Sequence, residues 1–253
     1  METPNKPQFV VEGLFPLPLY KTNIGRKFTK EEQDEIDIIV NEGVKENPRN
    51  TIPNRSTFST DTYLLNGTHK PLLPLQTFIE EHINQFVSNV LGIDTSKVFC
   101  NITQAWMVVN KPQQFQPPHF HQNSIISGVF YIKCLKGEKR TEDSFTTDKG
   151  NFEAPFEGGD GIVFTKDDNA MFKTIHPPLG HPTPFNCQSV NIEIDNGDLV
   201  LFPSYVKHSV NRNETSDQIR ISLAFNTFLF GTLGNNISLT EMNLKQGRIS
   251  NEN

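Results

Sequence analysis

Two segments in the first hundred residues repeat apolar side chains at the spacing of a helix. Thr29 followed by Glu32 is the pattern of a capping box, and apolar side chains then recur at helical intervals through residues 36–44. A longer apolar stripe occupies residues 75–91 and stops at Gly92, a residue type that often ends helices. The pattern therefore predicts two helices that each pack one face against a sheet.

From Val98 onward the apolar period changes from about 3.6 to 2, which is the period of a strand. Short β-forming segments then alternate with clusters of Gly, Pro and Asn. Helices followed by a run of strands predict an α+β fold, mainly β, built as a β-sandwich or jelly roll. The expected strands span residues 98–110, 125–134, 161–165, 189–194, 198–202, 205–210 and 220–229.

The chain has no internal repeat and no shift of composition that is typical of a linker, so we expect one domain over residues 1–253. Residues 136–160 are polar, charged and contain glycine, which predicts a long loop. After about residue 234 the chain is rich in Asn and weakly patterned, so we expect this tail to be weakly ordered.

Composition excludes several classes of protein. The chain has 29 acidic and 23 basic side chains, and its net charge of −6 disfavours nucleic acid or an anionic membrane as a partner. No apolar run has the length of a membrane helix, and residues 1–18 lack the pattern of a signal peptide. The three cysteines are widely separated, which argues against zinc knuckles and a disulfide framework.

Three of the seven histidines fall where they could hold one metal ion. His119 and His121 are separated by one residue, and in an extended strand such residues point to one face about 6–7 Å apart. His208 lies on the expected strand 205–210, and a jelly roll brings distant strands side by side. Imidazole suits iron, zinc, copper or nickel. An H-x-H pair alone also fits a loose surface pair, so its spacing leaves both interpretations open.

The last expected strand carries Arg220, Ser222, Ala224 and Asn226 on one face. If that face points inward, the Arg and Ser provide a guanidinium fork and a hydroxyl that suit a carboxylate. A buried Arg without a partner is costly, so an inward Arg220 predicts an anionic ligand or a protein acid. An outward, solvated Arg220 is the alternative that the spacing leaves open.

Two sequence blocks become specific when they occur in this order: H-x-H-x-N-S…S-G-x-x-Y and G-D-L-V-L-F-P-S…H…R-I-S. On these blocks the chain resembles the 2-oxoglutarate- and Fe(II)-dependent oxygenases, in particular an oxygenase group of marine bacteria and their phages. The resemblance covers roughly the whole chain before the tail. The matching segments are residues 15–18, Trp106, Asn110, residues 119–131, 197–204, 208–210 and 220–226.

The resemblance implies a double-stranded β-helix, which is a jelly roll whose mouth holds iron, with the N-terminal helices as its support. By the same resemblance His119 is the first iron ligand and His208 is the distal one. The superfamily usually supplies a carboxylate as its third ligand, whereas this chain has His121 at that position. Because its parity matches that of His119, we expect His121 to ligate iron; the alternative is that water or a co-substrate fills the position.

The resemblance also implies a co-substrate site in which Arg220, assisted by Ser222, binds the distal carboxylate of 2-oxoglutarate. Tyr131 shares the odd-number parity of the two histidines, and its phenol could reach that carboxylate if the strand runs unbroken. A core Tyr is the alternative. Asn123 and Asn226 are candidate contacts to the substrate or to the metal ligands.

The implied activity is that of a dioxygenase, an oxidoreductase that hydroxylates an unknown small-molecule or protein substrate. Fe(II) is the expected cofactor, and 2-oxoglutarate is the co-substrate that is decarboxylated to succinate. Two alternatives stay open: a three-His dioxygenase that does not use 2-oxoglutarate, and a non-catalytic jelly-roll binding module. We expect Trp106 in the core and the protein in the cytoplasm, which is the host's if a phage encodes the chain. The sequence does not decide the oligomeric state.

Overall fold

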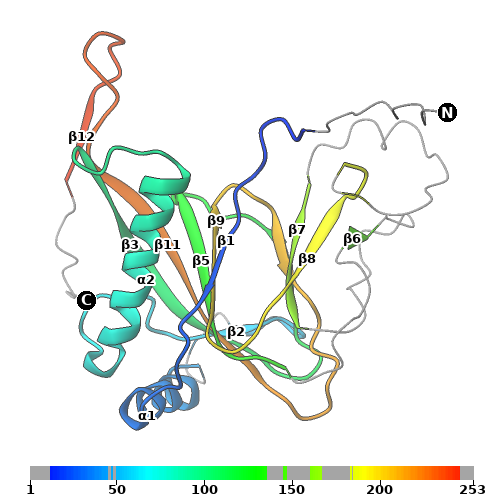
Figure 1. The fold of residues 1–253 in the computed structure, drawn as a ribbon. Helices are drawn as coiled ribbons and strands as arrows, with labels where there is room; N and C mark the ends of the chain where they lie inside the picture. The colour runs from blue at the N-terminus through cyan, green and yellow to red at the C-terminus, as the bar shows by residue number, and fades with distance from the viewer. Residues whose placement is uncertain are drawn as a thin grey trace, which may run out of the picture.

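Two antiparallel sheets and a layer of helices build the protein (Figure 1). The computed structural model describes residues 12–44, 47, 50–135, 145–146, 160–166, 183 and 185–245. Within this part of the chain, no helix has both the length and the apolar character needed to cross a membrane. The three cysteines are free thiols.

The larger sheet, called the major sheet below, has the strand order β1-β9-β5-β11-β3-β2, and β12 also pairs with β11. Its strands are β1 Tyr20–Asn23, β2 Thr57–Phe58, β3 Val98–Asn110, β5 Ile126–Lys133, β9 Asp198–Pro203, β11 Arg220–Leu233 and β12 Met242–Leu244. The longest pairing joins β11 to β3, with Arg220 opposite Asn110 at one end. The expected strand 98–110 coincides with β3, and the expected strand 220–229 is the first part of β11.

The smaller sheet, called the minor sheet below, has the order β4-β10-β7-β8-β6. Its strands are β4 Gln116–His119, β6 Phe145–Thr146, β7 Gly161–Thr165, β8 Ser189–Glu193 and β10 His208–Val210. β4 was not expected, because its sequence QPPH contains two prolines, which cannot donate to a strand ladder. Its place at the edge of the sheet is the position where strand prolines are tolerated.

The helices lie where the apolar stripes predicted them. Helix α1 spans Lys30–Ile38 and continues into the π-helical turn η1 Ile39–Gly43. Helix α2 spans Leu73–Gln85. It follows the 3-10 turn η2 Lys70–Leu72 and continues into the π-helical turn η3 Phe86–Val90. The capping box of α1 is confirmed, because the Thr29 hydroxyl accepts from the Glu32 N–H and the Glu32 carboxylate accepts from the Thr29 N–H. Gly92 follows η3 with a φ of +63°, a left-handed conformation that suits glycine.

The main core lies between these helices and the outer face of the major sheet (Figure 1). Alternation along β11 sends Leu223 and Phe225 into this core, and sends Ser222 and Ala224 toward the other sheet. A second apolar cluster, which includes Phe202 and Ile162, lies between the two sheets. The predicted fold, a mainly β double-stranded β-helix with N-terminal supporting helices, is confirmed.

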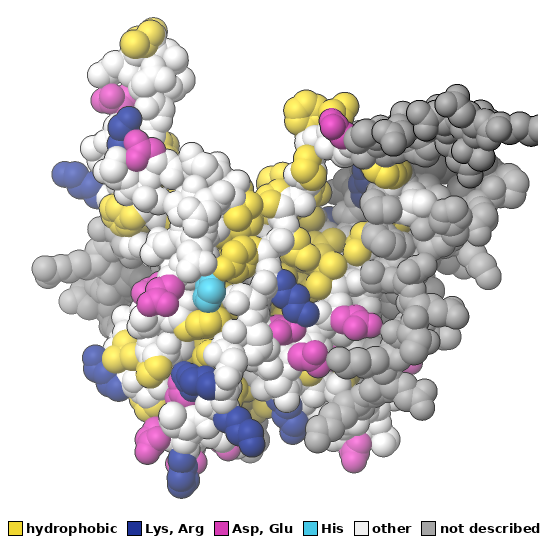
Figure 2. All heavy atoms as spheres, in the orientation of Figure 1, with side chains coloured by type: hydrophobic (Ala, Val, Ile, Leu, Met, Phe, Trp, Pro, Cys, Tyr) yellow, Lys and Arg dark blue, Asp and Glu magenta, His cyan; other side chains and the backbone are white. Residues whose placement is uncertain are grey.

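Beyond Gly234 the chain turns back on itself and β12 pairs with the end of β11. This hairpin projects from the body of the protein in Figure 1, and Figure 2 shows hydrophobic side chains at its tip. Ile237 and Leu239 are 97% and 92% exposed. The expected loop over residues 136–160 lies outside the described residues, apart from β6 and Asp160.

Candidate active site

A cavity of about 390 Å³ lies between the two sheets. Its wall on the major sheet is formed mainly by alternate residues of β3, β5 and β11, because alternation directs every second side chain away from the helix layer. Its wall on the minor sheet includes residues of β4 and β10. The four residues that were expected to share a face of the last strand all line this cavity: Arg220, Ser222, Ala224 and Asn226.

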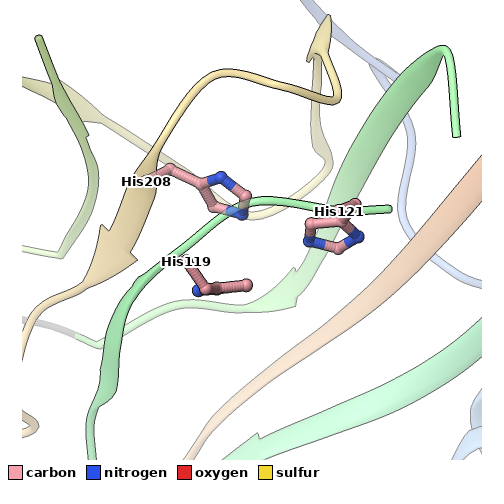
Figure 3. Close-up of side chains that lie close together, drawn as sticks. All are labelled: His119, His121 and His208. Atoms are coloured by element: carbon pink, nitrogen blue, oxygen red, sulfur yellow. The ribbon is translucent and has the colours of Figure 1, made fainter. Parts of the chain in front are cut away.

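The three candidate metal ligands meet at this cavity (Figure 3). His119 ends β4 and His208 begins β10, and the two residues lie directly opposite each other in the strand pairing. The candidate ligand atoms of His119, His121 and His208 all lie within 4.8 Å of one another. The expectation that His121 shares a strand with His119 is wrong, since β4 ends at His119 and the His121 N–H donates to the Ser204 carbonyl at 2.9 Å.

Hydrogen bonds fix which nitrogen each ring presents. The Nδ1 atoms of His119 and His208 lie 2.8 and 3.0 Å from the carbonyl oxygens of Pro117 and Val206, each two residues earlier in the chain. A carbonyl oxygen only accepts hydrogen bonds, so each Nδ1 carries the proton. The lone pair is then on Nε2, and this is the tautomer that can bind a metal ion through Nε2.

His121 is oriented by residues of the major sheet. Its Nδ1 lies 2.6 Å from Asn226 Oδ1, which also accepts from the Ser127 hydroxyl at 3.2 Å. The Trp106 ring lies 6.0 Å from the imidazole at an interplanar angle of 21°. Asn226 therefore contacts a candidate ligand, and Trp106 is a wall of the cavity, so the expectation that it lies in the core is wrong.

Burial keeps the three imidazoles neutral at pH 7. It lowers the pKa of His121 to about 4 and that of His208 to about 3, and it also lowers the pKa of His119. Metal binding requires the neutral ring, so the cavity already holds all three side chains in the form that ligation needs.

Arg220 points inward and is paired. Its side chain is 4% exposed, and its NH1 forms an ion pair with Oδ1 of Asp160, which is also 4% exposed. The expectation that an inward Arg requires an anionic ligand or a protein acid is met by a protein acid. Sequence reasoning missed Asp160 as a site residue, and the only available signal was this requirement, since Asp160 lies 60 positions from its partner.

Two further polar groups face the cavity and lack a hydrogen-bond partner among the described residues: the Tyr131 hydroxyl and the Asn110 Oδ1. Tyr131 is 2% exposed, and it pairs with Ser222 across β5 and β11. Burial raises the pKa of its phenol, so the hydroxyl stays a hydrogen-bond donor. The condition that was set for Tyr131, an unbroken strand from the two histidines, is not met, but the register of the major sheet still brings Tyr131 to the same cavity.

Residues 104–226 match the family described as "Putative 2OG-Fe(II) oxygenase". This segment contains the three histidines, Tyr131, Asp160 and Arg220, which are the residues that the structure gathers around the cavity. The matched segment is a 2OG-Fe(II) oxygenase domain. Its class of activity is that of a 2-oxoglutarate-dependent oxygenase, and the cofactors of that class are Fe(II) and 2-oxoglutarate.

None of the curated proteins matches the chain. Solved structures with a similar fold include the α-ketoglutarate dependent carbocyclase SnoK of nogalamycin biosynthesis (TM-score 0.49, 8% identity, 91% of this chain and 90% of that one covered). A prolyl-4-hydroxylase from Pseudomonas putida follows at TM-score 0.40 and 15% identity, over 83% of this chain and 92% of that one. A 2OG-Fe(II) oxygenase family oxidoreductase from Burkholderia pseudomallei has a TM-score of 0.34 and 12% identity over 56% of this chain. The match spans about half of that protein's length, 48%.

Asn123 is the candidate residue that lies away from the cavity of the oxygenase domain. It is exposed, and it has a φ of +53° in the turn after His121. Asn adopts this left-handed conformation more readily than most residues, so the shape of the turn explains why an Asn occupies this position. Asn110, by contrast, faces the cavity opposite Arg220, and no role was expected for its amide.

Proposed function

We propose that the protein is a 2-oxoglutarate- and Fe(II)-dependent oxygenase that hydroxylates its substrate while 2-oxoglutarate is decarboxylated to succinate. One observation carries the proposal: three neutral imidazoles converge in a cavity that also contains a buried guanidinium and a phenol without a partner among the described residues. Iron bound there would supply the activation of oxygen, which protein side chains alone do not provide. The narrower grouping with oxygenases of marine bacteria and phages stays a prediction.

The metal is assigned to His119, His121 and His208. Their donor set fits iron, because imidazole is a common ligand of this metal and each ring presents Nε2. Hydrogen bonds hold two of the rings to backbone carbonyls and the third to Asn226. Such partners fix the orientation of a ligand and increase its basicity.

The co-substrate carboxylate is assigned to Arg220, Ser222 and Tyr131, which together are called the carboxylate clamp below. A buried hydroxyl without a partner costs about 1–3 kcal/mol, so an acceptor that fills this place restores that energy on binding. The carboxylate of 2-oxoglutarate is such an acceptor. Arg220 adds N–H donors at the same wall of the cavity, and a charged donor forms the stronger hydrogen bond.

Two other functions compete with this one. A three-His dioxygenase without 2-oxoglutarate would have no use for the carboxylate clamp. A non-catalytic binding module would have no use for three imidazoles that all present the same nitrogen to one another. The substrate is proposed to be a small molecule or a protein, and neither nucleic acid nor a membrane is proposed as a partner.

An anaerobic titration with Fe(II) and then 2-oxoglutarate tests the proposal. We expect the weak visible charge-transfer band of the chelate in the native protein and a large loss of 2-oxoglutarate affinity in Arg220→Met, with iron retained. Arg212→Met is the matched control, because it removes the same charge from a side chain that stacks on Phe115 outside the cavity lining. Bound iron without the band would support the three-His dioxygenase, and failure to bind iron would support the binding module.

A further inference from the structure

Asp160 is held on both of its carboxylate oxygens. Oδ1 pairs with NH1 of Arg220, and Oδ2 accepts the N–H of Leu135 at 2.6 Å. Asp160 directly precedes β7 of the minor sheet, Leu135 follows β5, and Arg220 begins β11. The carboxylate is therefore fixed between the two sheets, and it holds the guanidinium from one direction.

The pairing leaves Arg220 able to bind a second anion. A guanidinium has five N–H donors in a rigid plane, and the contact with Asp160 is made through NH1. Arg220 also lines the cavity beside Ser222 and Tyr131. Because the plane is rigid, fixing NH1 also fixes the direction in which the other donors point.

The charges around the cavity explain why an acid is needed here. In the usual site of this superfamily, a ligand carboxylate offsets one positive charge of the metal. An imidazole binds a metal through a nitrogen lone pair of its neutral form, so three such ligands offset none of that charge. A divalent metal with dianionic 2-oxoglutarate sums to zero, and an unpaired Arg220 would leave a buried positive charge, which is costly in a protein interior.

We propose that Asp160 is the positioning residue of the carboxylate clamp: it orients Arg220 toward 2-oxoglutarate and supplies, away from the metal, the negative charge that His121 does not provide at the metal. This inference rests on the proposed function. In the described contacts Asp160 touches none of the metal ligands, and it is not itself a residue of the cavity lining, so it acts through Arg220.

Binding measurements separate this role from a purely structural link between the sheets. Asp160→Ala should weaken 2-oxoglutarate binding at least about 10-fold, and metal affinity should stay within about 2-fold. Both affinities are measured by titration. For 2-oxoglutarate, the readout is the visible band in the Fe(II)-loaded protein and the rise of Tm in the Zn(II)-loaded protein. Formate at tens of millimolar should restore part of the 2-oxoglutarate affinity of Asp160→Ala, because it can occupy the place of the lost carboxylate.

Asp198→Ala is the matched control. Asp198 is also buried, pairs with Lys21 at 2.9 Å and accepts the Asp195 N–H at 2.7 Å, but it does not line the cavity. It should lower Tm without changing 2-oxoglutarate affinity. If Asp160→Ala does not fold, Asp160→Asn keeps the shape and should show a smaller loss of 2-oxoglutarate affinity.

Unchanged or tighter 2-oxoglutarate binding in the Asp160 variants would overturn the proposal, because Asp160 would then compete with the co-substrate for Arg220. An equal loss of metal affinity would also overturn it. A native protein that binds iron but shows no band would instead contradict the proposed function, so the two failures are distinguishable.

Discussion

The two sheets contribute to the site in different ways. The central strands of the major sheet, β5, β9 and the first part of β11, are largely buried, between the helices on one face and the minor sheet on the other, and β9 is buried along its whole length. The strands β4, β8 and β10 of the minor sheet are mostly half-buried. His119 and His208 belong to the minor sheet, whereas the carboxylate clamp belongs to the major sheet.

The difference lies in how each side chain is oriented. The rings of His119 and His208 are fixed locally, by carbonyls two residues earlier in the chain. The clamp depends on distant segments, because Tyr131 reaches Ser222 through strand register and Arg220 reaches Asp160 across the two sheets. The orientation of these two metal ligands therefore depends little on the rest of their sheet, whereas the geometry of the carboxylate clamp depends on the strand register of the major sheet.

The largest expected effect follows from packing in the major sheet. Gly128 lies in β5, where an added methyl group would overlap the Phe225 ring and approach Leu201. Gly128→Ala should cost about 3 kcal/mol of unfolding free energy, measured by urea denaturation, because the core on this side is closed. At Gly161 in β7, the three nearest described atoms to an added methyl group all belong to the side-chain amide of Asn191, and Gly161→Ala should cost about 1 kcal/mol. Equal losses would contradict the difference between the sheets.

The next effect is on the metal. His208→Ala should lower metal affinity about 100-fold, or about 2.8 kcal/mol, because one of three ligands is lost. Competition with a chelator measures this affinity. His82→Ala is the control, since His82 is a part-buried histidine of α2 that contacts Tyr20 away from the cavity. Full metal affinity in His208→Ala would overturn the ligand assignment.

Local patterns in the sequence made much of the fold predictable. The strands β3 and β7 were expected with the bounds that the structure has, because both segments are rich in β-forming residues. The cap at Thr29 was predictable because its partner Glu32 lies three residues away. β4 was not predictable, because its prolines argue against a strand unless its edge position is known.

The site was less predictable than the fold. The convergence of His119, His121 and His208 follows from strand pairing that a jelly roll makes plausible. The parity argument for Tyr131 used a strand that the chain interrupts, although the residue does face the cavity. Asp160 could be anticipated only as an unidentified acid, because no local pattern selects a partner for Arg220 from 60 residues away.

A smaller effect sharpens the role of the major sheet. Tyr131→Phe should weaken 2-oxoglutarate binding about 10-fold, or about 1.4 kcal/mol. It should also stabilise the ligand-free protein by about 1 kcal/mol, because it removes a buried hydroxyl that has no partner among the described residues. Titration and urea denaturation measure the two quantities. Tyr20→Phe is the control: its hydroxyl lies 2.6 Å from His82 Nδ1, so stability should fall while 2-oxoglutarate affinity stays unchanged. A Tyr131 variant that loses stability and keeps affinity would show that the hydroxyl has only a structural role.

The smallest expected effect belongs to the helix layer, which supports the major sheet and takes no part in the site. His69 lies between Glu35 of α1 and Asp61, with its ring nitrogens 2.6 and 3.0 Å from their carboxylate oxygens. Burial by itself lowers the pKa of His69, but the hydrogen bonds to Glu35 and Asp61 together outweigh burial and raise it. The folded state therefore binds the proton more tightly than the unfolded state, whose His pKa is about 6.5.

This linkage predicts a pH dependence with a defined sign. The stabilising contribution of His69 is fully present below about pH 6.5 and is lost as the pH rises through its raised pKa. His69→Gln should therefore cost about 0.5 kcal/mol of unfolding free energy at pH 5.5 and almost nothing at pH 9. His82→Gln gives the opposite trend, because burial lowers the pKa of His82 and its contribution is lost as the pH falls. Neither substitution should change metal or 2-oxoglutarate affinity, and a change in either affinity would mean that the helix layer is coupled to the site through the major sheet.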